Sequence, residues 1–176
     1  MQKRANLEAL KIYIMHYQLS DDFTAQPERT NFWRKFDGRC QFRIISEKFV
    51  QVFSQWVIRP DGKGYTKMWQ YTDDQPILSD GERYEGSNPS RKVVFCVTPV
   101  EGNDSPPPVL LVVNQQVAKQ ILTLATELQG LTVADFVIIA QGTGTQKSYT
   151  VMAQPMAPMN QELEKLGKAF DILAEL

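Results

Sequence analysis

The sequence has one histidine, His16, and two cysteines, Cys40 and Cys96, among 176 residues. No Ser-His-Asp or Cys-His arrangement can form without His16, and nothing in the sequence places a cysteine beside it. Two thiols and one imidazole at these spacings do not match a zinc ligand set, and two cysteines cannot build a disulfide framework. We therefore expect no enzymatic activity, no metal site and no cofactor.

Long apolar runs are also missing. No stretch approaches the ~20 apolar residues that a membrane-crossing helix needs. The basic first residues are not followed by the apolar segment of a secretory signal, and a low cysteine content is typical of intracellular proteins. We therefore expect a cytoplasmic protein without membrane contact.

The net charge is only -1, which excludes a uniformly basic surface, but the charge is unevenly distributed. Residues 1–92 contain 15 basic and 12 acidic side chains, whereas residues 93–176 contain 4 and 8. Residues 29–67 contain 9 basic and 3 acidic side chains, and residues 29–71 hold 10 of the 18 aromatic residues, including all three tryptophans. Such interleaving suits single-stranded nucleic acid, because cations follow phosphates and rings stack on unpaired bases. A β-rich core with basic residues on its solvated face would give the same pattern.

Hydrophobic spacing and turn residues predict a chain made mostly of strands. The expected elements in the first half are a helix or strand over 7–18, a loop over 20–30, one long strand over 42–58 or two strands with a bend near 47–48, a turn over 60–64, a strand over 65–72 and a long loop over 73–90. In the second half we expect strands over 92–100 and 109–113, a helix over 114–130, strands over 136–139 and 148–153, and a helix over 160–176. The strand over 109–113 is apolar on both faces, which predicts a central position in the sheet.

This order predicts a mainly β fold, namely a small antiparallel barrel of the OB-fold type with one internal helix and a C-terminal helix. A two-layer α+β sheet is the alternative. We expect three parts: an N-terminal helix or arm over residues 1–30, an OB-like nucleic-acid-binding domain over 31–155, and a helical tail over 156–176.

Strand alternation separates binding candidates from core residues. Lys67, Trp69 and Tyr71 share one face of their strand, and we expect this face to be solvent-exposed because a core would not easily accommodate the lysine. Packing inside the protein is the alternative for both rings. Trp56 shares its face with apolar residues, so we expect it in the core. The full set of nucleic-acid-binding candidates is Trp33, Arg34, Lys35, Arg39, Arg43, Phe53, Arg59, Lys67, Trp69, Tyr71, Lys147 and Tyr149.

Four segments carry a resemblance to a known family. They are Phe36–Ile45 (FDGRCQFRII), Phe53–Trp56 (FSQW), Pro108–Leu124, and Leu131–Val151 (LTVADFVIIAQGTGTQKSYTV). Over about residues 31–155 the sequence resembles the phage-encoded single-stranded-DNA-binding proteins of the OB-fold type. The resemblance implies coating and protection of single-stranded DNA during phage-type replication or recombination, in the host cell cytoplasm. The chain departs from this family in lacking the zinc ligand set of some relatives and a dense acidic tail.

The final helix adds a question about partners. Its apolar positions, Leu163, Leu166, Phe170 and Leu173, repeat at helical spacing. This face can dock on the barrel, on a sister subunit in a homo-oligomer, or on a replication or recombination protein. Single-stranded DNA, with RNA as a further candidate, is the expected ligand. The alternative hypothesis is a non-enzymatic protein–protein adaptor or a virion or assembly component that uses the same small barrel.

Overall fold

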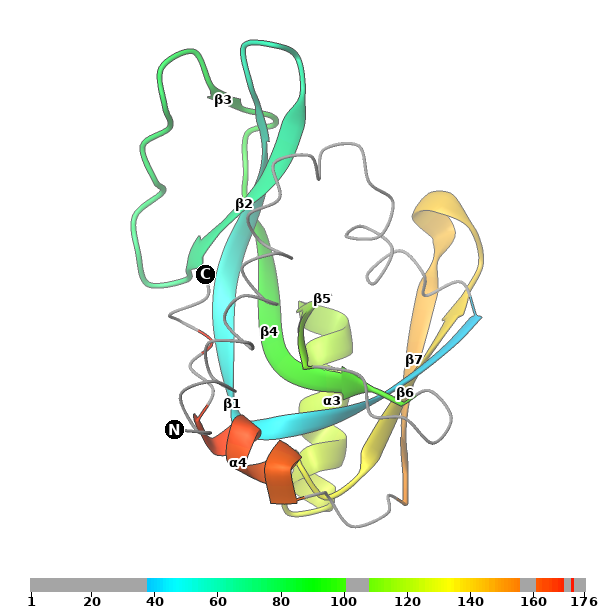
Figure 1. Ribbon diagram of the computed structural model, residues 1–176. Helices are drawn as coiled ribbons and strands as arrows, with labels where there is room; N and C mark the ends of the chain where they lie inside the picture. Colours follow the sequence, from blue (N-terminus) through cyan, green and yellow to red (C-terminus); the bar gives the residue numbers. More distant parts are fainter. Residues whose placement is uncertain (1–37, 101–107, 156–160, 170–171, 173–176) are drawn as a thin grey trace.

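The computed structural model describes residues 38–100, 108–155, 161–169 and 172. The arm expected over 1–30 and the candidates Trp33, Arg34 and Lys35 lie outside these residues. The elements are β1 (Gly38–Ile58), β2 (Gly64–Gln70), β3 (Arg83–Tyr84), β4 (Ser90–Pro99), β5 (Val109–Asn114), α3 (Gln115–Glu127), β6 (Asp135–Gln141), β7 (Ser148–Gln154) and α4 (Gln161–Ala169) (Figure 1). A short 3-10 turn, Gly144–Gln146, precedes β7. The prediction of a mainly β fold with one internal and one C-terminal helix is confirmed.

The strands form one antiparallel sheet in the order β5-β4-β1-β6-β7, and β2 and β3 pair with β1 outside this path. Over the described residues the sheet is open, since β5 and β7 stand at its two ends rather than pairing with each other. The barrel closure that the sequence predicts is therefore not observed. The expected central position of the strand over 109–113 is also wrong. This strand is apolar on both faces because its side chains contribute to a hydrophobic cluster on each side of the sheet.

The long strand β1 holds the sheet together because it changes partners along its length. Its first part, from Gly38 to Arg43, pairs with β6, and its last part, from Val52 to Ile58, pairs with β2. The strand β4 pairs with β1 across both parts, with a shift of register between Ile44 and Phe49. The structure therefore has the single long strand of the first alternative, with an irregularity of register around residues 47–48, where the second alternative placed a bend.

The register shift also decides which side chains face the core. Ile44 lies opposite Val97 and Phe49 lies opposite Phe95, so five steps along β1 match two steps along β4. Successive side chains of a strand alternate between faces, so an odd number of steps on one strand against an even number on the other reverses the alternation. Even-numbered residues of β1 therefore point into the larger core before the bend, and odd-numbered residues lie on that face after it.

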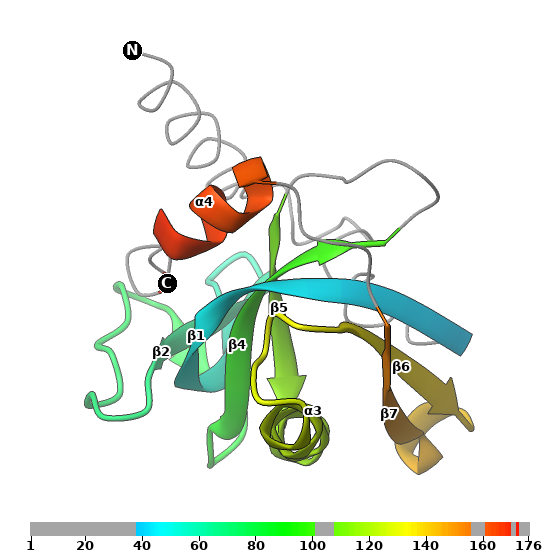
Figure 2. The same cartoon turned by 90° about the horizontal axis from the view of Figure 1, so that it is seen from below.

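The sheet has one helix on each face (Figure 2). On one side α3 buries Val117, Ala118, Ile121 and Ala125 against the larger hydrophobic cluster. The predicted N-cap is confirmed, because the side chain of Asn114 accepts a hydrogen bond of 2.8 Å from the backbone amide of Val117. Neither α3 nor α4, the two α-helices within the described residues, combines the length and the apolar composition needed to cross a membrane.

The second helix, α4, packs on the opposite face of the sheet. Leu163 is buried, and Ile172 beyond the helix belongs to a smaller cluster with Ile45 and Leu166. The backbone of Gly167 lies so close to the carbonyl of Ile45 that a Cβ at this position would overlap it. The described part of this apolar face therefore docks on the chain's own sheet. Phe170 and Leu173 lie outside the described residues.

Glu47, at the bend of β1, ties this strand to the segment that leads from α3 to β6. Its carboxylate accepts hydrogen bonds from the amides of Leu131 and Thr132, each 3.1 Å long, and one of 2.6 Å from the Thr132 hydroxyl. Partial burial raises the pKa of Glu47, but these hydrogen bonds together lower it by more, so its pKa lies below the ordinary value. The bend is thus connected to both helices.

The close approach at Gly167 predicts whether a substitution there lowers or raises the free energy of unfolding. We expect Gly167→Ala to lower the free energy of unfolding by about 1–3 kcal/mol, because the added methyl group forces α4 away from Ile45. In an undocked helix the same change would stabilise by about 0.5–1 kcal/mol. Urea unfolding measures the difference, with Lys165→Ala on the exposed side of α4 as the control. A more stable Gly167→Ala variant would contradict the docking.

The hydrogen bonds of Glu47 predict a dependence on pH. We expect Glu47→Gln to cost about 1 kcal/mol near neutral pH, a value reduced for solvent exposure. Because the folded pKa is lowered from 4.5, the stabilisation is complete above the unfolded pKa and is lost as the pH falls through the folded pKa. Unfolding measured from about pH 7 to about pH 3 should show the difference between wild type and variant shrinking only below about pH 4.5. A difference that grows on acidification would contradict this account.

Candidate nucleic-acid interface

The last part of β1 and the strand β2 form a hairpin that extends beyond both helices (Figure 1). The predicted turn over residues 60–64 is confirmed. The amide of Arg59 donates to the Lys63 carbonyl at 2.8 Å, and the side chain of Asp61 accepts from the Lys63 amide at 2.9 Å. Gly62 has a φ of 81°, which glycine adopts without a steric penalty. One face of the hairpin lies on the same side of the sheet as the larger hydrophobic cluster.

That face carries a row of aromatic rings, which we call the ring row: Tyr71, Phe53, Trp69 and Tyr84. Phe53 and Trp69 lie opposite each other in the β1–β2 register, and paired residues of antiparallel strands share a face. The ring centroids are 4.9 Å apart for Tyr71 and Phe53, 5.8 Å for Phe53 and Trp69, and 6.0 Å for Trp69 and Tyr84. The predicted candidates Phe53, Trp69 and Tyr71 are thus in direct contact.

Exposure divides the ring row. Tyr71 is 37% exposed, but Trp69 is only 6% exposed. The expectation that Trp69 faces solvent is therefore wrong, because Phe53 and Tyr84 flank the indole. The expectation that Trp56 lies in the core is also wrong: it is 40% exposed and rests against Gly64. The face assigned to Trp56 is apolar nearer the bend, but at this point the hairpin has passed beyond the cluster beneath α4.

The long loop expected over residues 73–90, which the structure ends at Pro89 before β4, is fixed against the hairpin by the buried side chain of Gln55. The Gln55 amide nitrogen donates to the carbonyls of Gly86 at 2.9 Å and Glu85 at 3.3 Å, and its oxygen accepts from the Gln75 side chain at 2.8 Å. A buried amide without such partners would be costly. These bonds hold both ends of the segment over the same residue.

A second cluster fixes the same segment farther along the hairpin. The hydroxyl of Tyr65 donates to Glu82 at 3.2 Å, and the guanidinium of Arg59 lies 3.9 Å from the same carboxylate. Arg59 also lies over the Tyr65 ring, 4.8 Å from its centroid. Burial and the Glu82 charge raise the pKa of both Tyr65 and Tyr84. Arg59, a predicted phosphate contact, therefore has a carboxylate beside it.

A cationic group, that of Arg91, borders the exposed end of the ring row, whereas Lys67 lies on the far side of Trp69 from Tyr71. The guanidinium carbon of Arg91, on β4, lies over the Tyr71 ring at 4.8 Å from its centroid, a distance at which cation and ring attract. Arg91 is exposed and lies opposite Phe53 in the β1–β4 register. Lys67 is half-buried and lies opposite Gln55.

An open groove begins beside Tyr71. It is lined by Phe49, Val50, Gln51, Gln70, Tyr71 and Thr72. Phe49 is 36% exposed and packs on Phe95 with centroids 5.6 Å apart. The groove therefore has an exposed ring from β1 and another from the residue after β2, and amide and hydroxyl side chains also line it.

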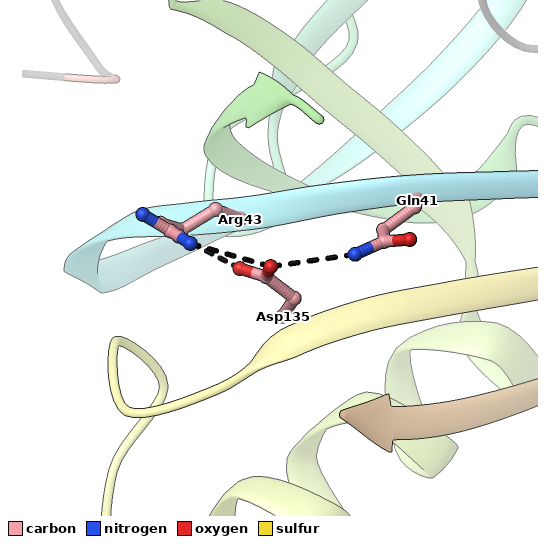
Figure 3. A network of polar contacts seen from close by, with 3 residues as sticks. All are labelled: Gln41, Arg43 and Asp135. Carbon is pink, nitrogen blue, oxygen red and sulfur yellow. Dashed lines mark hydrogen bonds and ion pairs between the residues drawn. The ribbon is translucent and has the colours of Figure 1, made fainter. Parts of the chain in front are cut away.

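Two other predicted candidates, Arg39 and Arg43, lie on the opposite face of the sheet, because they alternate with the core residues Phe42 and Ile44. Arg43 forms an ion pair with Asp135 of β6, with Nε 2.7 Å from Oδ1 (Figure 3). The side chains are 13% and 6% exposed, and Gln41 donates to the same carboxylate at 3.4 Å. The charge of Arg43 is therefore compensated inside the fold, and only Arg39 is exposed there.

The last two candidates, Lys147 and Tyr149, belong to the end of the sheet that carries β7. Both are half-buried. Tyr149 packs against the larger core, and its carbonyl accepts a hydrogen bond of 3.1 Å from the side chain of Gln120 on α3. The structure therefore does not bring these residues to the ring row.

Sequence reasoning missed three residues on the face of the sheet that carries the ring row, which we call the ring face. They are Phe49, Tyr84 and Arg91. The hydrophobic pattern of β1 contains Phe49, but its face depends on the register shift. Arg91 belongs to the basic half of the sequence, yet its position over Tyr71 follows only from the β1–β4 pairing. The excess of cationic and aromatic residues identified this region of the sequence, but the contacts of each residue follow only from the strand register.

No family model, curated protein or solved structure matches this chain. Within the described residues, no group of three or more histidine, cysteine, aspartate or glutamate side chains is arranged to hold a metal ion. What the ring face can do is therefore inferred from its own residues.

The Arg43–Asp135 pair gives a prediction about stability. We expect Asp135→Ala to cost about 3 kcal/mol of unfolding free energy, because it leaves the guanidinium largely buried without its counter-charge. The double variant Arg43→Met, Asp135→Leu should be more stable than the single variant. Thermal and urea unfolding of the three proteins test this. A cost below about 1 kcal/mol for Asp135→Ala would show instead that the pair behaves as an exposed one.

Proposed function

We propose that this chain binds single-stranded DNA, without strong sequence preference, on the ring face formed by β1, β2 and the start of β4. One observation carries the proposal: the exposed ring of Tyr71 continues into Phe53 on one side and has the Arg91 guanidinium over it. A stacking surface beside a cation is the combination that single-stranded nucleic acid requires.

The two most exposed rings of the face, Tyr71 and Phe49, border one groove. Bases stacking on such rings contribute about 1–3 kcal/mol each, and they do so for every base because each has a π-face. Trp69 supports the row from within, where it holds Phe53 and Tyr84 in place. Stacking by itself does not distinguish DNA from RNA, so RNA belongs to the same proposal.

In this proposal the chain coats and protects single strands during phage-type DNA replication or recombination, in the cytoplasm of the host cell. The family resemblance supports this role. The cations and rings of residues 29–71 support it further, because several of them gather on one face of the hairpin. The interaction needs no catalytic residue and no cofactor.

The competing function is that of a protein–protein adaptor. The apolar face of the C-terminal helix suggested it, but Leu163 and Leu166 of that helix pack against the chain's own sheet. The ring face itself remains compatible with a protein partner, since tyrosine, phenylalanine and arginine are enriched in protein interfaces. The two functions differ in how they respond to a bare oligonucleotide.

Binding of labelled oligo-dT, followed by fluorescence anisotropy, tests the proposal. We expect affinity to fall with salt by ~0.7 log units per log unit of salt for each phosphate contacted. Tyr71→Ala should weaken binding about tenfold or more for oligo-dT, oligo-dA and oligo-dC alike.

Met152→Ala is the matched control, because Met152 is an exposed apolar side chain on β7, far from the ring row in sheet order. It should bind as the wild type does. Absence of binding at micromolar protein in low salt, or an unchanged affinity for Tyr71→Ala, would contradict the proposal.

A further inference from the structure

Arg91 differs from the other arginines whose contacts the structure defines. The guanidinium of Arg43 is paired with Asp135, and that of Arg59 lies beside Glu82. Within the described part of the chain no carboxylate forms an ion pair with Arg91, and its guanidinium rests on the ring of Tyr71 instead. Its guanidinium, at the exposed end of the ring row, therefore has no counter-charge in contact among the described residues.

The position of Arg91 depends on the sheet. It lies opposite Phe53 on β4, whereas Tyr71 follows β2 and is joined to β1 by a hydrogen bond of 3.0 Å from its amide to the Gln51 carbonyl. The strands β4 and β2 are on opposite sides of β1. The Arg91 side chain therefore reaches across β1 to cover the Tyr71 ring.

A nucleotide contains a competitor for each partner of the Arg91–Tyr71 contact. A base would stack on the ring of Tyr71, which the guanidinium covers in the free protein. A phosphate would attract the guanidinium, because arginine forms bidentate hydrogen bonds with phosphate oxygens that are stronger than an exposed cation–π contact. A single nucleotide supplies both groups at once.

We propose that Arg91 and Tyr71 form one nucleotide subsite that works by exchange. On binding, the base takes the place of the guanidinium on the Tyr71 ring, and the guanidinium moves to a phosphate of the same strand. This inference rests on the proposed function and assigns Arg91, rather than the predicted Arg43 or Arg59, as a principal phosphate contact. No covalent bond is made or broken.

The exchange has a consequence that a simple ionic contact lacks. On binding, Arg91 gains one phosphate contact, which is strong at low salt. It also loses its contact with the Tyr71 ring, and the free energy of that loss does not depend on the phosphate contact. Removing Arg91 should therefore weaken binding at low salt and leave it equal or tighter at high salt. An exposed cation–π contact corresponds to roughly two- to fivefold in affinity.

The test is a salt titration of oligo-dT affinity for the full-length chain and its Arg91→Ala and Arg91→Lys variants. We expect Arg91→Ala to reduce the salt slope by ~0.7, and its line to cross that of the wild type, with affinity equal or up to about fivefold tighter at the highest salt. Arg91→Lys should keep the slope. Lys63→Ala, at the exposed turn of the hairpin, is the matched control and should reduce the slope less than Arg91→Ala.

The outcomes separate this inference from the proposed function. If the wild type binds but Arg91→Ala leaves the salt slope unchanged, the subsite is wrong and the proposed function stands. If the slope falls but the wild type binds more tightly than Arg91→Ala at every salt concentration, Arg91 contacts phosphate without exchange and the exchange is overturned. If the wild type does not bind oligo-dT, the proposed function itself fails.

Discussion

The irregularity between Ile44 and Phe49 is the constraint on which the rest of the structure depends. It lets one strand pair with β6 before the bend and with β2 after it, while β4 follows both parts. It also reverses the alternation of side chains, so that the rings after the bend lie on the same face as the larger core. Without it, the aromatic residues of the hairpin would point to the side that α4 covers.

The hairpin that emerges from this bend combines two demands that usually oppose each other. A row of rings is stable when it is buried, but stacking on a base requires an exposed ring. Exposure is graded along the row, from buried Trp69 through half-buried Phe53 to exposed Tyr71, and the stacking that we propose uses only its exposed end. The buried end is held by the segment that Gln55 fixes, and the exposed end is left to Arg91.

Local chemistry made several elements predictable. The charged residues at the bend, the glycine-rich turn of the hairpin and the Asn114 cap each act within a few residues, and each is found as expected. Contacts between residues far apart in the chain could not be predicted from the sequence. Alternation shows that Trp69 and Tyr71 share a face, but not that Tyr84 covers one of them. Likewise, the counter-charge of Arg43 is 92 residues away, and only the register of β1 and β6 brings it there.

The central claim is that single strands lie along the exposed end of the ring row. Ultraviolet cross-linking of bound oligo-dT, with the linked peptides identified by mass spectrometry, tests it most directly, because a stacked base lies in contact with the ring that holds it. We expect cross-links at Tyr71 and Phe49, and none at Tyr149, which packs against the larger core and is hydrogen-bonded to α3. Cross-links confined to β6 and β7 would contradict it.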